Sequence, residues 1–112
     1  MPRYEVEEYE TLDGRKPFSE WLLGLKDRIG KVKLQARIDR ASLGNFGDWK
    51  EIKGAHGLCE MREHYGPGYR IFYTIMGQKI IVLLAGSSKK DQKKTIAQAK
   101  AYLADYEERI ES

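Results

Sequence analysis

One stretch of the sequence, residues 58–90, constrains the fold more than any other because it predicts consecutive strands with charged side chains at fixed offsets. The stretch reads LCEMREHYGPGYRIFYTIMGQKIIVLLAGSSKK. Within it, Gly66-Pro67-Gly68-Tyr69 fits a type II turn, which takes Pro at its second position and Gly at its third, where φ is positive. We therefore predict a β-hairpin whose first arm covers residues 58–65.

The alternation of side chains assigns the residues of each arm to opposite faces of the sheet. On the first arm one face holds Leu58, Glu60, Arg62 and His64, and the other holds Cys59, Met61, Glu63 and Tyr65. On the second arm one face holds Arg70, Phe72 and Thr74, and the other holds Ile71, Tyr73 and Ile75. The latter face is apolar, so helices are expected to cover it, and the face with the arginines is predicted to be cationic.

Residues 79–85 are predicted to form a third strand after a tight connection at Gly77-Gln78. Because this segment is apolar after Lys79, it fits a strand buried on both faces near the centre of the sheet.

The length and charge of the chain limit its class. With 112 residues and a net charge of +3, the chain suits one domain, expected over residues 1–112, with one core. Acidic residues dominate the first 13 positions, whereas residues 14–90 hold 15 basic and 7 acidic side chains. This segregation favours a polyanionic partner over a membrane. The single cysteine and the lack of an apolar N-terminal segment predict a reduced, cytoplasmic protein.

The segments on either side of the hairpin complete the predicted fold. Residues 3–10 read as an edge strand, and Pro17 marks the start of a short amphipathic helix. A longer helix from about Gly30 ends at the glycines of residues 44–48, and a last helix follows Lys90. The order predicts an α+β fold of strand, helix, helix, three antiparallel strands and helix, with the helices packed on one face of the sheet.

Several short motifs in this order resemble one family. They are Pro17-Phe18 with Trp21-Leu22, the segment 44–47, Glu60-Met61-Arg62, the segment 65–70 with Tyr73, and the segment 86–90 before Ala97 and Tyr106. With them the chain resembles the RelE/ParE superfamily of bacterial toxins over nearly its whole length, and most closely the HigB-like branch of addiction-module killer proteins. The resemblance implies a RelE-like toxin of a type II toxin-antitoxin system. Such a toxin docks on the ribosome and cleaves mRNA as a metal-independent endoribonuclease, without a cofactor. Its partner is a cognate antitoxin, expected to be a helix-turn-helix protein.

The resemblance and the chemistry together suggest the site residues. Metal-free RNA cleavage uses the ribose 2′-hydroxyl as nucleophile, so it needs a proton acceptor, a proton donor and fixed cations around the phosphate. Arg70 follows the turn as the family's strand arginine does, and we expect it to contact the scissile phosphate with Arg62 beside it. Lys53, Lys89 and Lys90 are expected to complete a ring of positive charge at the ends of the strands.

The sequence leaves open which residues act as the general acid and the general base. Some RelE-type nucleases have a lysine where this chain has Glu60, and a tyrosine where it has the segment 92–95. His64 is the first candidate because its ordinary pKa lies near working pH, and Glu60 is a candidate general base. His56 and Tyr65 are weaker candidates. The alternative for Glu60 and Arg62 is an ion pair on a solvated sheet, and a histidine beside a turn is more often solvated than catalytic.

Other side chains are candidates for RNA binding. Lys33, Arg37 and Arg40 form a stripe on the long helix that suits ribosomal RNA or an acidic antitoxin segment, or is an ordinary wet helix face. Phe72 is expected to face the cationic groove, and Cys59 to be a small buried hydrophobe.

Two other functions fit the same expected fold: a ParE-like poison that binds DNA gyrase, and an RNA-binding module that has lost catalysis. We prefer the nuclease because the cationic cluster has no use in a poison.

Overall fold

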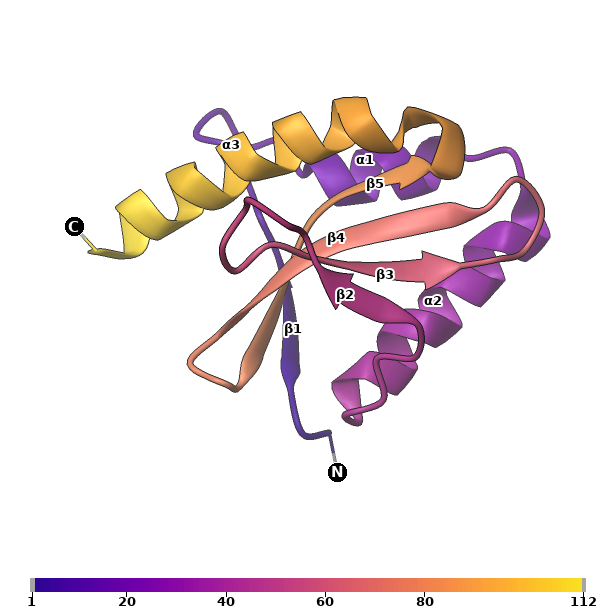
Figure 1. Ribbon diagram of the computed structural model, residues 1–112, viewed down its shortest axis with the longest axis horizontal. Helices are drawn as coiled ribbons and strands as arrows, with labels where there is room; N and C mark the ends of the chain where they lie inside the picture. The colour runs from indigo at the N-terminus through magenta and orange to yellow at the C-terminus, as the bar shows by residue number, and fades with distance from the viewer. Residues whose placement is uncertain (1, 112) are drawn as a thin grey trace.

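The computed structural model describes residues 2–111, which form a five-stranded sheet and three α-helices (Figure 1). The elements are β1 (Glu5–Glu8), α1 (Pro17–Gly24), α2 (Arg28–Ser42), β2 (Trp49–Glu51), β3 (Cys59–Glu63), β4 (Tyr69–Met76), β5 (Ile80–Ser88), a 3-10 turn η1 (Lys89–Asp91) and α3 (Gln92–Glu111). The strand order is β1-β5-β4-β3-β2. The edge strand β1 pairs with β5 in parallel, and the remaining neighbours are antiparallel.

Local signals explain where the helices begin and end. Pro17 occupies the first turn of α1, where its missing N–H is not needed. The carboxylate of Asp27 accepts a hydrogen bond from Gly30 N (2.9 Å) and caps α2, so this helix begins two residues before the expected Gly30. Gly44, with a φ of 99°, ends it.

The turn of the β3–β4 hairpin differs by one residue from the prediction. Gly68 has the expected positive φ, 81°, but its N–H donates to the carbonyl of Tyr65 at 3.1 Å, so the hydrogen-bonded turn is 65–68. Gly66, with a φ of 59°, supplies a second positive φ that the short connection needs.

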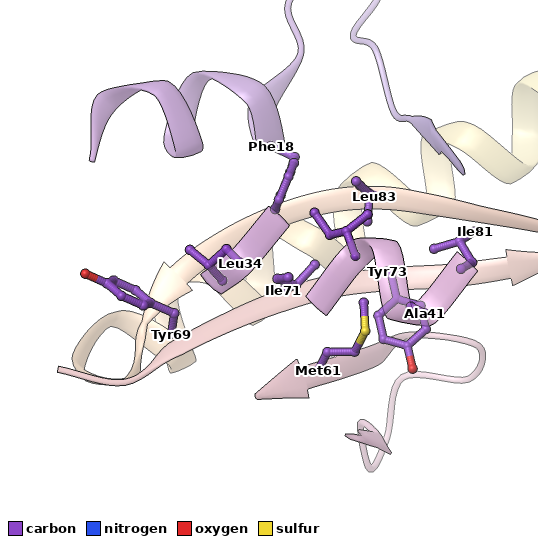
Figure 2. Packing of buried hydrophobic residues seen from close by; sticks show 10 residues of the cluster. Phe18, Leu34, Ala41, Met61, Tyr69, Ile71, Tyr73, Ile81 and Leu83 are labelled. Atoms are coloured by element: carbon purple, nitrogen blue, oxygen red, sulfur yellow. The ribbon is translucent and has the colours of Figure 1, made fainter. Parts of the chain in front are cut away.

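One core lies between the sheet and the helices α1 and α2. Leu34 and Ala41 from α2 and Phe18 from α1 meet Ile71 and Tyr73 of β4, as Figure 2 shows. Trp21 of α1 packs against Gly86 of β5, where a Cβ atom would lie 2.1 Å from the indole ring. The apolar face predicted for β4 is therefore the face that α1 and α2 cover.

A second core lies on the other face of the sheet, beneath α3. Ala99 and Leu103 of α3 pack with Phe72, Val82 and Leu84. The prediction that all helices share one face is wrong, and Figure 1 shows α3 apart from α2. The reason lies in β5, whose residues 81 and 83 join the first core while residues 82 and 84 join the second. A strand that is apolar on both faces needs cover on both.

The short strand β2 was not predicted. Its three residues are exposed and pair only with β3, placing it at the edge of the sheet opposite β1. The predicted order of elements has no strand between the long helix and the hairpin. A strand this short is fixed by pairing with its neighbour and not by its own pattern.

Candidate functional site

The registers of the strands bring several predicted site residues to one end of the sheet. The end of β3 pairs with the start of β4 through Glu63 and Tyr69, and Tyr69 pairs in turn with Ser88 at the end of β5. Arg62, His64, Arg70 and Lys89 therefore share this end. Lys53 lies in the connection from β2 to β3, at the opposite end of β3, so the predicted ring that included it does not form.

Glu60 lies on β3 with no exposed surface and forms the centre of a buried polar cluster. Its Oε2 accepts a hydrogen bond from Arg62 Nε at 3.0 Å and forms an ion pair with Arg70 Nε at 3.1 Å. Its Oε1 accepts a hydrogen bond from Gln92 Nε2 at 2.9 Å. A buried carboxylate is tolerated only when charge and hydrogen bonds compensate it, which these three partners do. Both oxygens are occupied and away from solvent, which argues against the predicted role of Glu60 as a general base.

Arg70 is buried, contrary to the expectation that it lies on an open cationic face. Besides Glu60, its guanidinium meets the carbonyl of Tyr69, which accepts from Nη1 at 3.2 Å. The start of α3 covers this part of the sheet, because Gln92 reaches the same carboxylate. In this arrangement the charge of Arg70 is neutralised inside the protein and is not presented to a phosphate.

Phe72 is also buried and does not face a groove. It has no exposed surface and packs with Leu58 and Leu84 in the core beneath α3. Base stacking needs an accessible aromatic face, so the predicted RNA contact of Phe72 is wrong.

Arg62 links the buried cluster to the surface. Its side chain is 28% exposed, and its Nη1 lies 4.0 Å from Asp48 Oδ1. The hydrogen bond to Glu60 raises the pKa of Arg62 and keeps its guanidinium charged. Of the two arginines that face each other across β3 and β4, Arg62 is the one that solvent and a ligand can reach.

His64 lies just beyond β3 and is held by Asp48. His64 Nε2 is 2.7 Å from Asp48 Oδ2, and the imidazole is 68% exposed. This contact, with a smaller contribution from the charge of Arg62, lowers the pKa of Asp48. Because an ionised carboxylate only accepts hydrogen bonds, Nε2 is the donor in this contact, and the other ring nitrogen, Nδ1, takes no part in it. The contact therefore orients the ring of an exposed histidine beside Arg62.

Sequence reasoning missed two residues at this end of the sheet. Asp48 was treated only as part of the segment that ends the long helix, yet its carbonyl accepts from Arg62 N at 2.8 Å and so aligns it with His64. Lys50 pairs with Glu60 across β2 and β3 and is exposed. The available signal was the alternation of Asp48 and Lys50, which is typical of one face of a strand. It was overlooked because β2 itself was not predicted.

The lysines after β5 are exposed, as a role in anion binding requires. Lys89 N donates to the carbonyl of Gly68 at 2.9 Å, which fixes this lysine beside the hairpin turn. Lys90 follows it in η1. Lys89 therefore lies near the start of β4, and a role of either lysine in RNA cleavage or binding stays a prediction.

The stripe of basic residues on α2 lies over the other face of the sheet. Arg37 contacts Glu63 Oε1 at 3.4 Å and is largely buried, and the Lys33 ammonium lies 5.3 Å from the centre of the Tyr65 ring. Arg40 is exposed. The three residues are therefore not part of the cluster around Arg62 and His64.

Cys59 lies on β3 and is partly buried. Burial raises the pKa of the Cys59 thiol to about 11, so it stays protonated and unreactive.

Among residues 2–111, no group of three or more Cys, His, Asp and Glu side chains is arranged to hold a metal ion. No helix in this range is both long and apolar enough to cross a membrane.

Comparisons with known proteins place the chain in context. Residues 20–105 match the family model described as phage derived protein Gp49-like (DUF891). An uncharacterized protein of Haemophilus influenzae is 41% identical over 83 residues, which cover 74% of this chain and 82% of that protein. A chain in the crystal structure of the RelB-RelE antitoxin-toxin complex from Methanococcus jannaschii aligns with a TM-score of 0.49 and 22% identity. This alignment covers 70% of the present chain and 91% of that chain.

Proposed function

We propose that this chain, which belongs to the phage-derived Gp49-like family, is the toxin of a type II toxin-antitoxin module and cleaves mRNA on the ribosome. The motifs it shares with the HigB-like branch of the RelE/ParE superfamily support this proposal. Its partners are then the ribosome, mRNA and a cognate antitoxin. Cleavage of mRNA would inhibit translation.

The exposed pair of His64 and Asp48 beside Arg62 is the observation on which the nuclease proposal depends. Nδ1 of His64 takes the proton of a ribose 2′-hydroxyl, and the 2′-oxygen attacks the adjacent phosphorus. The bond to the 5′-oxygen breaks, leaving a 2′,3′-cyclic phosphate and a 5′-hydroxyl. Arg62 lies two residues away on the same strand face and stabilises the charge that develops on the phosphate oxygens. Lys89, which follows β5, adds a second cation and donates a proton to the leaving 5′-oxygen.

Arg70 and Glu60 take a different role in this proposal from the one expected. Arg70 would have to leave the buried carboxylate of Glu60 before it could touch a phosphate. We assign Arg62 to the phosphate, and we assign Glu60 and Arg70 to holding Arg62 in place.

The burial of Glu60, Arg70 and Phe72 favours one alternative, a binding module without catalysis, because it removes three of the expected site groups. A ParE-like gyrase poison is the second alternative. Pulse labelling after induced expression separates these functions. A nuclease toxin stops protein synthesis first, a gyrase poison stops DNA synthesis first, and an inactive module stops neither.

Cleavage by the purified chain on ribosomes programmed with mRNA tests the chemistry directly. His64→Ala should slow cleavage by about a hundredfold or more. His56→Ala is the matched control, since His56 is fully exposed and lies at the opposite end of β3. Equal rates for wild type and His64→Ala would remove the observation on which the nuclease proposal rests.

A further inference from the structure

The helix α2 has two apolar stripes, and only one of them packs against the sheet. The inner stripe consists of Gly30, Leu34, Ile38 and Ala41. The outer stripe consists of Ile29, Val32, Ala36 and Leu43 at the helix end, and the exposed fractions of Ile29, Val32 and Leu43 are 57%, 69% and 57%. Single exposed aliphatic residues are common on soluble proteins, but an aligned row of them usually marks an interface.

The outer stripe has the spacing of a coiled-coil seam. Ile29, Val32, Ala36 and Leu43 fall at i, i+3, i+7 and i+14, which are the a, d, a and a positions of consecutive heptads. Asp39 occupies the remaining d position and is hydrogen bonded to Gln35 at 3.1 Å. At 1.5 Å per residue the helix offers a seam roughly 22 Å long, enough for a partner helix of three to four turns.

The positions that flank this seam are positively charged. The e and g positions hold Arg28, Lys33, Gln35, Arg40 and Ser42, and none of them is acidic. Arg28, Lys33 and Arg40 are exposed. In coiled coils these flanking positions select the partner by charge, so a complementary helix needs acidic residues beside its own apolar seam.

We propose that the outer stripe of α2 is the docking site for one helix of a partner protein, amphipathic and flanked by Glu or Asp. The identification of that partner as the antitoxin rests on the proposed function. The docking itself requires no nuclease chemistry, because α2 lies over the sheet face opposite Glu60 and Arg62.

The chemistry of the stripe disfavours two other occupants. RNA is bound by cations at its phosphates and by aromatic faces at its bases, and a row of Ile, Val and Leu offers neither. A second copy of this chain would bring the same basic flanks together across the seam, which like-charge repulsion opposes.

Binding of synthetic helices to the purified full chain tests the proposal. The probe is a fluorescent peptide of about three heptads with Leu at a and d and Glu at e and g. Its matched control has Lys at e and g. We expect the Glu peptide to bind more weakly as salt is raised, and the Lys peptide to bind at least about tenfold more weakly than the Glu peptide at low salt.

Variants of the chain locate the binding surface. Ile29→Ser and Val32→Ser should each weaken binding of the Glu peptide at least about fivefold, because burial of an aliphatic side chain is lost. Leu12→Ser is the control, since Leu12 is 82% exposed and lies outside α2. Arg40→Glu should weaken binding of the Glu peptide and strengthen binding of the Lys peptide. Thermal unfolding of each variant confirms that these surface changes leave the fold intact.

Three results overturn the proposal. In the first, the Glu peptide does not bind the wild-type chain, or it binds and Val32→Ser does not change its affinity. Another is loss of single-stranded RNA binding in Val32→Ser, which assigns the stripe to RNA. The third is a dimer in sedimentation that Val32→Ser dissociates, which assigns it to a second copy. A chain that binds the peptide through α2 but cleaves no mRNA contradicts the proposed function alone.

Discussion

Gln92, the first residue of α3, donates a hydrogen bond of 2.9 Å to the buried carboxylate of Glu60 on β3. This contact joins the last helix to the strand that holds Arg62. The carboxylate of Glu60 thus serves two purposes: it fixes the start of α3 and it neutralises the buried charge of Arg70. The arrangement of the candidate site therefore depends on a residue that solvent does not reach.

Removing that carboxylate should destabilise the protein. Glu60→Ala leaves the guanidinium of Arg70 buried without its partner, and we expect the free energy of unfolding to fall by about 3 kcal/mol. Chemical denaturation measures this free energy of unfolding. Glu107→Ala, an exposed change on α3, is the control and should alter stability by less than about 0.5 kcal/mol. Similar values for the two variants would show that the cluster contributes little.

The two arginines that contact Glu60 should separate stability from activity. Arg70→Ala should lower the free energy of unfolding by about 3 kcal/mol, because Arg70 is buried. Arg62→Ala should cost only about 1 kcal/mol, because Arg62 is partly exposed and Glu60 keeps two partners. At a temperature where both variants are folded, Arg62→Ala should nevertheless lose more mRNA cleavage. The reverse order of activity would return the phosphate contact to Arg70.

The contact with His64 should be visible in the titration of Asp48. Carbon NMR of the Asp48 carboxyl should give a pKa below the ordinary value of 3.8, and His64→Ala should raise it. Because the folded pKa is lowered, the stabilising contribution is present above the unfolded pKa and is lost as pH falls through the folded value. An Asp48 pKa that is the same in wild type and His64→Ala would contradict the proposed pairing.

Tyr69 should make the protein less stable in alkali. Burial, assisted by the hydrogen bond of the hydroxyl to Asp27 at 2.6 Å, raises the pKa of Tyr69 to about 12. The unfolded chain ionises first, near the ordinary value of 10.0, so stability is lost as pH rises from there through the folded pKa. Absorbance titration of tyrosinate should show one late-titrating group fewer in Tyr69→Phe, and the loss of stability in alkali should be smaller in that variant.

Gly86 should be intolerant of a side chain. In Gly86→Ala the new methyl group would lie 2.1 Å from the ring of Trp21, so the packing of Trp21 must change and we expect a cost of about 1–3 kcal/mol. Gly24→Ala is the control, because nothing lies within 4 Å of its Cβ position and Ala favours a helix. Thermal unfolding of the two variants should give a lower midpoint only for Gly86→Ala.

The hairpin and the start of α1 were predictable because their signals are local. Alternation separated Met61 from Glu60 and Phe72 from Tyr73, and the structure keeps each pair on opposite faces of the sheet. Pro17 marked the first turn of α1 for the same reason. These features depend on a few neighbouring residues, whose steric preferences act whatever surrounds them.

The candidate site was predictable only in part. The sequence indicated Arg62, His64 and Lys89, which the strand registers bring to one end of the sheet. It could not indicate that Asp48 holds His64, because the two residues are 16 positions apart and meet only when β2 pairs with β3.

The sequence by itself determined which residues share a face of each strand, while the tertiary structure decided what covers that face. Apolar residues recur along α3 at helical spacing, at positions 96, 99, 103, 106 and 110, so this helix must pack on the sheet, but an amphipathic helix fits either side of a sheet. The choice followed from β5, which is apolar on both faces and needs a helix on each. Because α3 lies over the second face, Arg70 and Phe72 are buried, while Arg62 and His64 lie at its margin. Burial depends on residues that are distant in the sequence, so only the tertiary structure decides it.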